Sequence, residues 1–442
     1  MKKRPVLTPP VHKWHIVYFF MRLLANQGLT RFHRLSIQSD YKRLTESEDP
    51  VLLVSNHQNG MIDGMNISGA FFKQFSWLIR ADVFWKAGVR RFLYGLNLLP
   101  IYRQRDRHAD LRERNNVIWN CCIERFEMGG SLGLYPEGNH NPQKTIRGLK
   151  RGVSDLLGKA VTKNSDLSKI ILMPLGLDYE NYPEYRNRLS LRVGKPIKWF
   201  DLYDSETGLV DFRVLNTRIQ DALRELTVDI QPAQEYEILE PYVRALKTYE
   251  AEEEHWIEIK EELRRIKDLG GNQNWIEKVK TEYEALVKAG FRKENRPEAW
   301  GVNQTDVREG KYWAIALTPF SWIANIPTAL QQYLLNRKCD NIKAVEFRST
   351  FKIGAGMFIY PITWTVIAVA VGLACEVFDF CGFWYGFIGL WSWATFGNKF
   401  YGWLKGHVHD HKDAVVGSKF WREEKSMTKR QAWEKYIEAI KS

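Results

Sequence analysis

The stretch VLLVSNHQNGMIDGM, residues 51–65, decides the fold class. It opens with a five-residue apolar run that is too short for a typical helix and is characteristic of a strand buried in a sheet. The run changes abruptly to polar residues, and His57 and Asp63 follow it. Ligands of parallel sheets bind at the carboxyl ends of the strands. The pattern therefore indicates an α/β fold with functional side chains at the end of this strand.

The spacing of His57 and Asp63 constrains the backbone that joins them. On a continuous helix, two residues six positions apart point about 240° from each other and cannot touch. A contact requires His57 in the loop after the strand and Asp63 in the first turns of the following helix. Asn59 and Gly60 form a turn dipeptide that accommodates such a bend. We therefore expect the chain to turn at Gly60.

Residues 35–235 repeat this alternation of short apolar runs and helical stretches. Strand-like runs occupy residues 131–136 and 170–179, a shorter one begins at Leu189, and a helical stretch covers residues 107–128. Strands alternating with helices are typical of a mostly parallel or mixed sheet. We predict an α/β domain over residues 35–235, with a mixed sheet flanked by helices.

The composition narrows the class of partner. The formal net charge of +12 favours an anionic partner such as a phosphate ester, an anionic lipid or nucleic acid. Nucleic acid fits poorly, because the basic residues flank apolar segments and do not form one stripe. The five cysteines show no Cys-x-x-Cys spacing, so we expect reduced thiols, a cytosolic environment and no metal site.

Residues 1–34 form a separate N-terminal segment. Its apolar run, residues 14–21, is interrupted by Arg22 and is too short to span a bilayer, which needs about 20 apolar residues. We predict an interfacial amphipathic helix with Lys13, Arg22 and Arg31 directed toward lipid phosphates. A helix packed on the core of the domain is equally consistent with the pattern.

The charge and hydrophobicity of the sequence change twice in the C-terminal half. Residues 236–305 combine helical periodicity with dense mixed charge and a break at Gly270-Gly271, which predicts a charged helical hairpin. Within residues 306–405, two nearly uncharged runs, 357–378 and 380–404, follow each other closely. Each is long enough to cross a bilayer, so we predict a transmembrane hairpin at about residues 357–404.

The flanks of this hairpin predict its orientation. Lysine and arginine are enriched on both sides of it, at Lys338, Lys343, Arg348, Lys352, Lys399 and Lys405. Such enrichment places both outer ends in the cytoplasm. Residues 312–335 contain Pro319 and Pro327 and are predicted to be interfacial or re-entrant, with a third, broken membrane span as the alternative. We expect residues 406–442 to form a charged cytoplasmic tail.

Polar segments follow the apolar runs of the α/β domain in order. Histidine is the side chain that most often acts as a general base, so His57 is a candidate base and Asp63 is suited to orient it. Arg103 offers a planar cation for a phosphate. Glu137 and Gly138 form a turn that lets the backbone approach a ligand. The stretch TIRGLKRG, residues 145–152, adds three cations, Arg147, Lys150 and Arg151.

Together these segments resemble the motifs of glycerophospholipid acyltransferases. The matching residues are Asn56, His57 and Asp63; Gly95, Pro100 and Arg103; Pro136, Glu137 and Gly138; and Pro174. The resemblance covers about residues 35–205. The C-terminal part also looks like the membrane extension of bacterial members and of fungal glycerol-3-phosphate acyltransferases. The chain departs from the family pattern at one point, because five residues separate His57 from Asp63 where the family has four.

The resemblance implies an acyl transfer from a thioester to a glycerol-phosphate hydroxyl. It implies that His57 is the general base and Asp63 its orienting partner, and that Arg103 holds the phosphate of the acceptor. Glu137 and Gly138 would line the acceptor site. We add Asn59, Lys150 and Arg151 as substrate-binding residues.

The predicted function is that of an integral cytoplasmic-membrane enzyme acting on 1-acyl-glycerol-3-phosphate. Its donor would be acyl-CoA or acyl-carrier protein, its other partner is membrane lipid, and no cofactor or metal is needed. Glycerol-3-phosphate is the alternative acceptor. A catalytically inactive, membrane-anchored lipid-binding protein is the alternative class. A metal-dependent phosphoesterase using His57, Asp63 and His140 is a weaker third interpretation.

Overall fold

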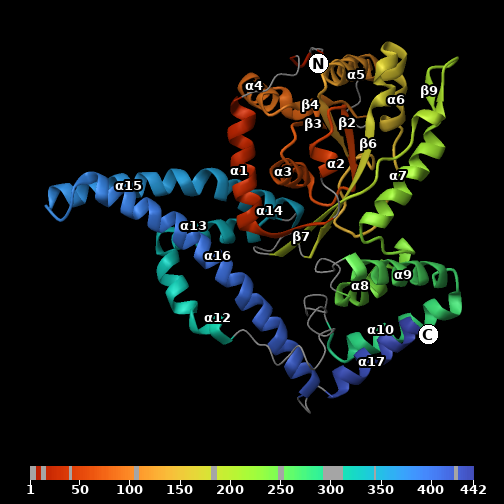
Figure 1. Cartoon of the computed structure of the whole chain (residues 1–442). Helices are drawn as coiled ribbons and strands as arrows, with labels where there is room; N and C mark the ends of the chain where they lie inside the picture. Colours follow the sequence, from red (N-terminus) through yellow and green to blue (C-terminus); the bar gives the residue numbers. More distant parts are fainter. Residues whose placement is uncertain are drawn as a thin grey trace. The chain divides into compact units, whose positions relative to one another are not determined.

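The computed structural model describes residues 6–10, 16–38, 42–103, 109–180, 187–246, 253–291, 312–342, 345–422 and 427–442. The chain forms two compact units. The first contains residues 1–29, 37–177 and 190–227, and the second contains residues 30–36, 178–189 and 228–442. The predicted boundary at 235/236 thus lies eight residues beyond the last residue of the first unit. Figure 1 shows the helices and strands of both units.

The predicted mixed sheet flanked by helices is confirmed. Seven strands lie in the order β1-β7-β6-β2-β5-β3-β4, with β2 paired in parallel to β5 and β6, and β3 paired in parallel to β5 and β4. The strands are β1 (His33–Gln38), β2 (Val51–Ser55), β3 (Phe75–Arg80), β4 (Leu98–Ile101), β5 (Ser131–Leu134), β6 (Ile171–Tyr179) and β7 (Asn187–Val193). A separate antiparallel pair joins β8 (Tyr203–Asp204) to β9 (Leu209–Val210).

The helices around this sheet also follow the predicted alternation. They are α1 (Ile16–Phe32), α2 (Lys42–Thr45), α3 (Gly60–Ala70), α4 (Ala87–Gly95), α5 (Leu111–Glu127), α6 (Gly152–Lys163) and α7 (Phe212–Leu226), with short 3-10 turns η1 (Ala81–Phe84), η3 (Ser165–Lys169) and η4 (Phe200–Leu202). Strand β5 ends two residues earlier than predicted. Pro136 has no N–H with which to continue the ladder.

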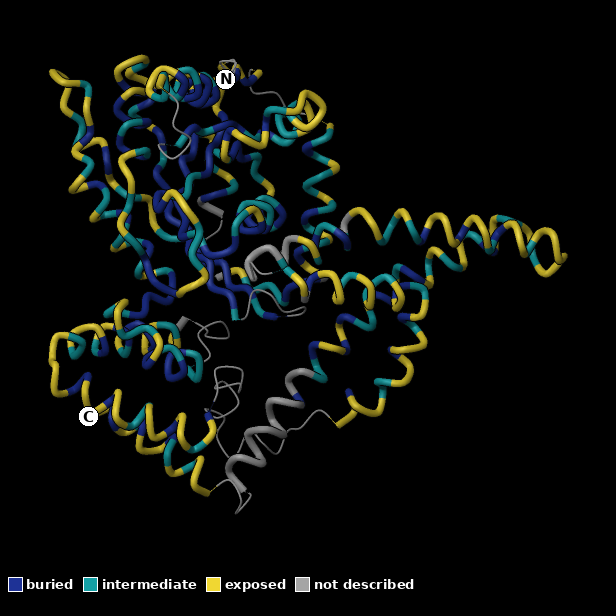
Figure 2. The backbone as a smooth tube through the Cα atoms, turned by 180° about the vertical axis from the view of Figure 1, so that it is seen from behind, coloured by how far each residue is buried: buried dark blue, intermediate teal, exposed yellow. Residues whose placement is uncertain are grey.

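Strand β2 lies at the centre of the sheet, and all five of its residues are fully buried. One face of the sheet packs against α5, α6 and α7 through a core that includes Leu52, Leu132 and Leu172. On the other face, α3 lies over β3, where Trp77 Nε1 donates to Ser68 Oγ at 2.9 Å. Helix α1 packs on α3, with Asn26 Nδ2 donating to the Gly69 carbonyl at 2.8 Å. Figure 2 shows the strands buried, and the helices around them with buried residues on one side and exposed residues on the other.

Helix α1 packs on the core, which is one of the two interpretations of the N-terminal segment, and an interfacial position stays a prediction. Ala25 and Leu29 are buried, so one face packs on the core. Ile16, Phe20 and Leu23 are exposed and lie four and three positions apart, on one face of the helix. The predicted contribution of Lys13 lies outside the described residues.

The second unit is helical apart from its share of the sheet. Its helices are α8 (Tyr236–Ala245), α9 (Glu253–Leu269), α10 (Gln273–Lys288), α12 (Tyr312–Ala316), α13 (Thr318–Asp340), α14 (Val345–Gly354), α15 (Tyr360–Val377), α16 (Phe383–Arg422) and α17 (Met427–Lys441), with the 3-10 turn η5 (Ala233–Glu235) and the π-helix η7 (Ala355–Ile359). The predicted break at Gly270-Gly271 separates α9 from α10. Residues 292–311, which belong to the predicted hairpin and membrane regions, lie outside the described part.

The end of the chain is part of a core. Trp433, Tyr436 and Ile440 of α17 are buried in one cluster with residues of α8, α9 and α10. Tyr436 Oη donates to the Ile238 carbonyl at 2.5 Å. The charged hairpin and the C-terminal segment, which the sequence treats as separate, therefore form one helical bundle.

One described helix, α15, is long and apolar enough to cross a membrane. Only 17% of this helix is buried. Helix α16 packs along it, because Gly372 and Gly386 allow the two backbones to approach closely.

Candidate active site

His57 and Asp63 meet at the carboxyl end of β2. His57 lies in the loop after the strand, and Asp63 lies in the first turn of α3. The distance from His57 Nδ1 to Asp63 Oδ2 is 2.8 Å. Gly60 has a φ of +41°, a left-handed conformation that glycine adopts readily, so the extra residue is accommodated where the sequence predicts the bend.

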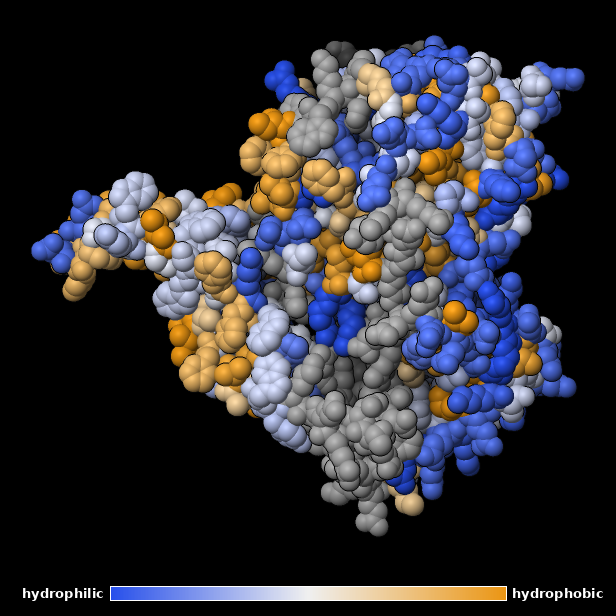
Figure 3. All heavy atoms as spheres, viewed as in Figure 1, coloured by the Kyte–Doolittle hydropathy of each residue, from blue (hydrophilic) through white to orange (hydrophobic). Residues whose placement is uncertain are grey.

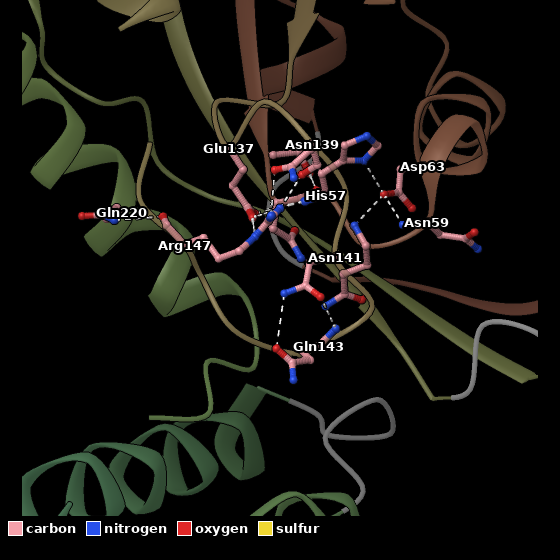
Figure 4. A network of polar contacts seen from close by, with 12 residues as sticks. His57, Asn59, Asp63, Glu137, Asn139, Asn141, Gln143, Arg147 and Gln220 are labelled. Atoms are coloured by element: carbon pink, nitrogen blue, oxygen red, sulfur yellow. Dashed lines mark hydrogen bonds and ion pairs between the residues drawn. The ribbon is translucent and has the colours of Figure 1, made fainter. Parts of the chain in front are cut away.

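Asp63 is fully buried but well supplied with donors. Its Oδ2 also accepts the backbone N–H groups of Gln58 and Asn59, each at 2.8 Å. Its place in the first turn of α3 further favours a negative charge. These donors hold the carboxylate in position, so Asp63 fixes the proton of His57 on Nδ1. Nε2 lies on the edge of the ring that faces away from Asp63 (Figure 4).

Glu137 holds the histidine loop from the other side. Glu137 Oε1 accepts the backbone N–H of His57 at 3.3 Å, and Oε2 accepts Nε of Arg147 at 2.6 Å. Burial raises the pKa of Glu137, and the charge of Arg147 opposes this effect. The loop is closed by the N–H of Asn141, which donates to the His57 carbonyl at 2.9 Å. Figure 4 shows the side chains of Glu137 and Arg147 pointing toward each other.

Gly138 and Lys150 lie next to this network. Gly138 has a φ of +79°, and its N–H donates to the Tyr135 carbonyl at 3.0 Å. Lys150 donates its backbone N–H to the Pro136 carbonyl at 2.8 Å, and a Cβ added at Gly138 would lie 3.3 Å from Lys150 Cγ. The structure thus brings Lys150 against the Pro-Glu-Gly turn.

Aromatic rings cover one face of the histidine. The Tyr135 ring stacks on His57 with centroids 3.9 Å apart and an interplanar angle of 10°. Trp77 stacks on the far side of Tyr135 at 5.2 Å and 17°. His140 approaches His57 edge-on, with centroids 5.7 Å apart.

The remaining predicted site residues are less closely associated with His57. Arg103 follows β4, at the same edge of the sheet but three strands from β2, or about 14 Å at the usual strand spacing. Its charge contributes to lowering the pKa of Asp82, although the hydrogen bond from Arg80 is the main cause. The guanidinium of Arg151 lies over the Phe212 ring of α7, 4.4 Å from its centre.

Sequence reasoning missed several of the residues around His57. Tyr135 directly precedes the Pro-Glu-Gly turn, so its place at the end of β5 was the available signal. Arg147, one of the three cations of residues 145–152, pairs with Glu137 in the structure. Asn59 was predicted to bind substrate, yet its side chain is fully buried and its backbone N–H serves Asp63. No cluster of three or more metal-ligating side chains occurs among the described residues.

The structure thus brings together a strand-end histidine, a buried aspartate and a Pro-Glu-Gly turn, as the sequence predicts. Residues 35–178 match the family model described as Acyltransferase. Residues 35–178 thus resemble an acyltransferase domain, in agreement with the enzyme class predicted for this region.

Individual relatives match shorter stretches. An uncharacterized acyltransferase of Schizosaccharomyces pombe is 26% identical over 126 residues, which are 28% of this chain and 18% of that protein. Glycerol-3-phosphate O-acyltransferase 2 of Saccharomyces cerevisiae is 26% identical over 83 residues, or 19% of this chain and 11% of that protein. The chain thus aligns with less than a fifth of the length of these curated relatives.

Among solved structures, the 1-acyl-sn-glycerophosphate (LPA) acyltransferase from Thermotoga maritima superimposes with a TM-score of 0.35 at 14% identity. The superposition covers 47% of this chain and 79% of that one.

Proposed function

We propose that this protein is a membrane O-acyltransferase that transfers a fatty acyl chain from a thioester to the hydroxyl of 1-acyl-glycerol-3-phosphate. The observation that carries the proposal is the 2.8 Å contact between His57 Nδ1 and Asp63 Oδ2. It leaves Nε2 ready to accept a proton, because no hydrogen bond to Nε2 occurs within the described residues. The same contact favours an active enzyme over an inactive lipid-binding protein.

In the proposed reaction, His57 Nε2 takes the proton of the acceptor hydroxyl as its oxygen attacks the thioester carbonyl carbon. The carbon–sulfur bond then breaks, and the imidazolium returns the proton to the departing sulfur. Asp63 stabilises the imidazolium through the hydrogen bond from Nδ1. The donor is acyl-CoA or acyl-carrier protein, and the proposal needs no cofactor.

We assign Arg103 to the phosphate of the acceptor, because a guanidinium forms paired hydrogen bonds with phosphate oxygens. Lys150, next to Gly138, provides a second cation beside the Pro-Glu-Gly turn. Both carboxylate oxygens of Glu137 are already hydrogen-bonded. We therefore propose that Glu137 shapes the acceptor site by fixing the loop of His57.

The proposed location is the cytoplasmic membrane, with the acyltransferase domain on the cytoplasmic side. Helices α15 and α16 form the proposed transmembrane hairpin. The apolar, mostly exposed surface of α15 supports this assignment, as do the lysine and arginine residues on both flanks.

Glycerol-3-phosphate is the second candidate acceptor. The name of the Saccharomyces cerevisiae relative specifies that substrate for that protein. Both acceptors present a hydroxyl and a phosphate monoester, so the site chemistry described above fits both.

An acceptor panel tests the proposal. Membranes containing the protein are incubated with labelled acyl-CoA or acyl-carrier protein and with 1-acyl-glycerol-3-phosphate, glycerol-3-phosphate or a lysolipid without a phosphate monoester. We expect transfer to 1-acyl-glycerol-3-phosphate to be fastest. Transfer to glycerol-3-phosphate alone would support the second acceptor. Acceptor binding without transfer from either donor would indicate the inactive lipid-binding class.

A further inference from the structure

The polarity of α13 is the reverse of that expected for a helix on a water-soluble core. Ser321, Asn325 and Thr328 lie four and three positions apart on one face, and all three are buried. Large apolar side chains are each at least half exposed, namely Phe320, Trp322, Ile323, Ile326, Leu330, Tyr333 and Leu334. No charged residue occurs between Tyr312 and Asn336. Figure 3 shows apolar side chains gathered over this part of the second unit.

The inward polar face of α13 is hydrogen-bonded to α15. Trp364 Nε1 donates to Thr328 Oγ1 at 3.1 Å, and both residues are buried. One helical turn further along α13, Gln331 Nε2 donates to Thr363 Oγ1 at 2.6 Å. Interhelical bonds of this kind hold helices together where the surroundings offer no water.

The same face also packs on α16. Asn325 and Gln332 exchange side-chain hydrogen bonds within α13, and Asn398 Nδ2 donates to Asn325 Oδ1 at 3.5 Å. Gly397 lies against the Ala324 carbonyl, where an added Cβ would come within 1.9 Å of the oxygen. A small residue at the contact lets the two helices approach, as is common inside membranes.

These contacts place α13 beside one half of the α15–α16 hairpin. Helix α15 continues from Trp364 to Val377, a rise of about 20 Å toward the turn. Figure 1 shows α15 and the start of α16 extending beyond α13. A hydrocarbon core is about 30 Å thick, so α13 lies at the level of the half that is farther from the turn.

The bundle of α8, α9, α10 and α17 determines whether the chain crosses the membrane an even or an odd number of times. Trp275 Nε1 of α10 donates to the Ile440 carbonyl of α17 at 3.3 Å, so the chain before and after the membrane region lies on one side. The chain between Lys288 and Met427 must therefore cross an even number of times. Helices α15 and α16 account for two crossings. Outside 312–335 and 357–404, this stretch has no uncharged run long enough for another.

We propose that α13 is inserted into one leaflet beside the α15–α16 hairpin without crossing the bilayer. Its partner is the hydrocarbon of lipid acyl chains, which contacts the exposed apolar face, while the polar face is satisfied by α15 and α16. The inference rests on the membrane assignment of the hairpin within the proposed function. It does not depend on the identity of the acyl acceptor.

Single-cysteine labelling of the full chain in sealed vesicles tests this arrangement. The five native cysteines are replaced by alanine, and a membrane-impermeant maleimide is applied to Lys435→Cys, Asn341→Cys, Phe380→Cys, Trp322→Cys or Leu330→Cys. Lys435→Cys and Asn341→Cys should react from one side, and Phe380→Cys only from the opposite side. Trp322→Cys and Leu330→Cys should react at least tenfold more slowly than Asn341→Cys until detergent is added.

Two results would overturn the inference. Reaction of Asn341→Cys from the side of Phe380→Cys would mean that α13 crosses the bilayer. Rapid reaction of Trp322→Cys in sealed vesicles would mean that its apolar face contacts water. Acyl transfer is measured separately in vesicles with the wild-type chain, so the failure of the proposed function is recognised independently of the labelling pattern.

The rings of Trp77 and Tyr135 form a stack beside His57. Trp77 lies over Gly133 of β5, where an added Cβ would come within 2.4 Å of the Trp77 ring. Only a glycine leaves room for the indole in this place, and Ser68 holds its Nε1. Trp77 in turn supports the Tyr135 ring, which lies parallel to the imidazole of His57.

The stack restricts a motion that Asp63 leaves open. A single hydrogen bond at Nδ1 fixes one edge of the imidazole, while the stacked ring fixes its plane. The aromatic face also attracts the cation that forms when His57 takes up a proton. We infer that Tyr135 is a positioning residue that acts through His57, an inference that rests on the proposed role of His57 as the base.

The test compares Tyr135→Phe with Tyr135→Leu. The Tyr135 hydroxyl is buried and has no hydrogen-bond partner within the described residues, so phenylalanine should retain kcat/KM within about threefold. Leucine should lower kcat/KM at least tenfold and move the acidic limb of the pH profile to lower pH, because the imidazolium loses its aromatic neighbour. Wild-type kcat/KM and pH profile in Tyr135→Leu, or an equal loss in Tyr135→Phe, would overturn the inference. Full activity of His57→Ala would instead contradict the proposed function itself.

Discussion

The sheet edge of the first unit and the helices α13, α15 and α16 of the second both bury polar side chains, but for different reasons. At the sheet edge the buried groups are the carboxylates Asp63 and Glu137, each held by several donors. Around them the apolar side chains are inside the domain. Among the three helices the buried groups include neutral amides and hydroxyls, and many large apolar side chains are outside. The difference teaches that a buried polar group must be interpreted together with what covers the opposite surface.

The largest effect is expected at the sheet edge. Replacing Asp63 by Asn keeps the size of the side chain but removes the charge that fixes the proton on Nδ1 of His57. We expect kcat/KM to fall about 10²–10⁴-fold, the usual contribution of a general base. The assay is acyl transfer by matched amounts of membrane-embedded protein. Activity within tenfold of the wild type would show that the reaction does not require the charge of Asp63.

Two tryptophans of the second unit sharpen the comparison between core and lipid-facing surface. Trp433 is 3% exposed and Trp322 is 65% exposed. Trp433→Ala should lower the free energy of unfolding by about 3–5 kcal/mol, because it leaves a cavity in the bundle of α8, α9, α10 and α17. Trp322→Ala should cost less than about 1 kcal/mol. Denaturation of the detergent-solubilised protein measures both, and equal costs would contradict the assignment of the two surfaces.

The polar contact between α13 and α15 should have an intermediate effect. Thr328→Val keeps the shape of the side chain but leaves Nε1 of Trp364 without its acceptor. An unsatisfied buried donor costs about 1–3 kcal/mol. The control is Thr281→Val on the exposed face of α10, where about 0.5 kcal/mol or less is expected. Thermal denaturation compares the two variants. Indistinguishable midpoints would show that the hydrogen bond to Trp364 does not hold the helices together.

The smallest effect is a dependence of stability on pH. Burial raises the pKa of Glu137 above its unfolded value, so the folded state holds this proton more tightly than the unfolded state. The resulting contribution to stability is fully present below the unfolded pKa and is lost as the pH rises through the folded pKa. Glu137→Gln should abolish this acid-range slope. Denaturation midpoints of the wild type and of Glu137→Gln are measured at several pH values. An unchanged slope in Glu137→Gln would show that other groups cause the pH dependence.

Sequence reasoning was most successful where a local pattern carried the information. The uninterrupted apolar run of β2 identified the central strand, and the Asn59-Gly60 dipeptide identified the bend that lets His57 meet Asp63. Strand β3 was not predicted, because FSWLIR interrupts its apolar residues with serine and merges into the turn after it. Burial of its Trp77 depends on Gly133 of β5, a contact between residues distant in the sequence.

The remaining differences have similar causes. Glu137 was expected to line the acceptor site, which stays a prediction. Its pairing with Arg147 was not expected, because no local pattern specifies the path of the loop that carries Arg147. The segment after residue 405 was expected to be a charged tail. Its apolar residues Trp433, Tyr436 and Ile440 recur at helical spacing, which was a usable signal for a buried helix face.

The most direct test of the central claim measures acyl transfer by the His57→Ala variant. Wild-type and variant membranes, matched for protein content, receive the same labelled thioester and the preferred acceptor. Removal of Nε2 should lower the rate at least 10²-fold while the amount of membrane-inserted protein is unchanged. A variant that transfers the acyl chain at the wild-type rate would contradict the assignment of His57 as the base.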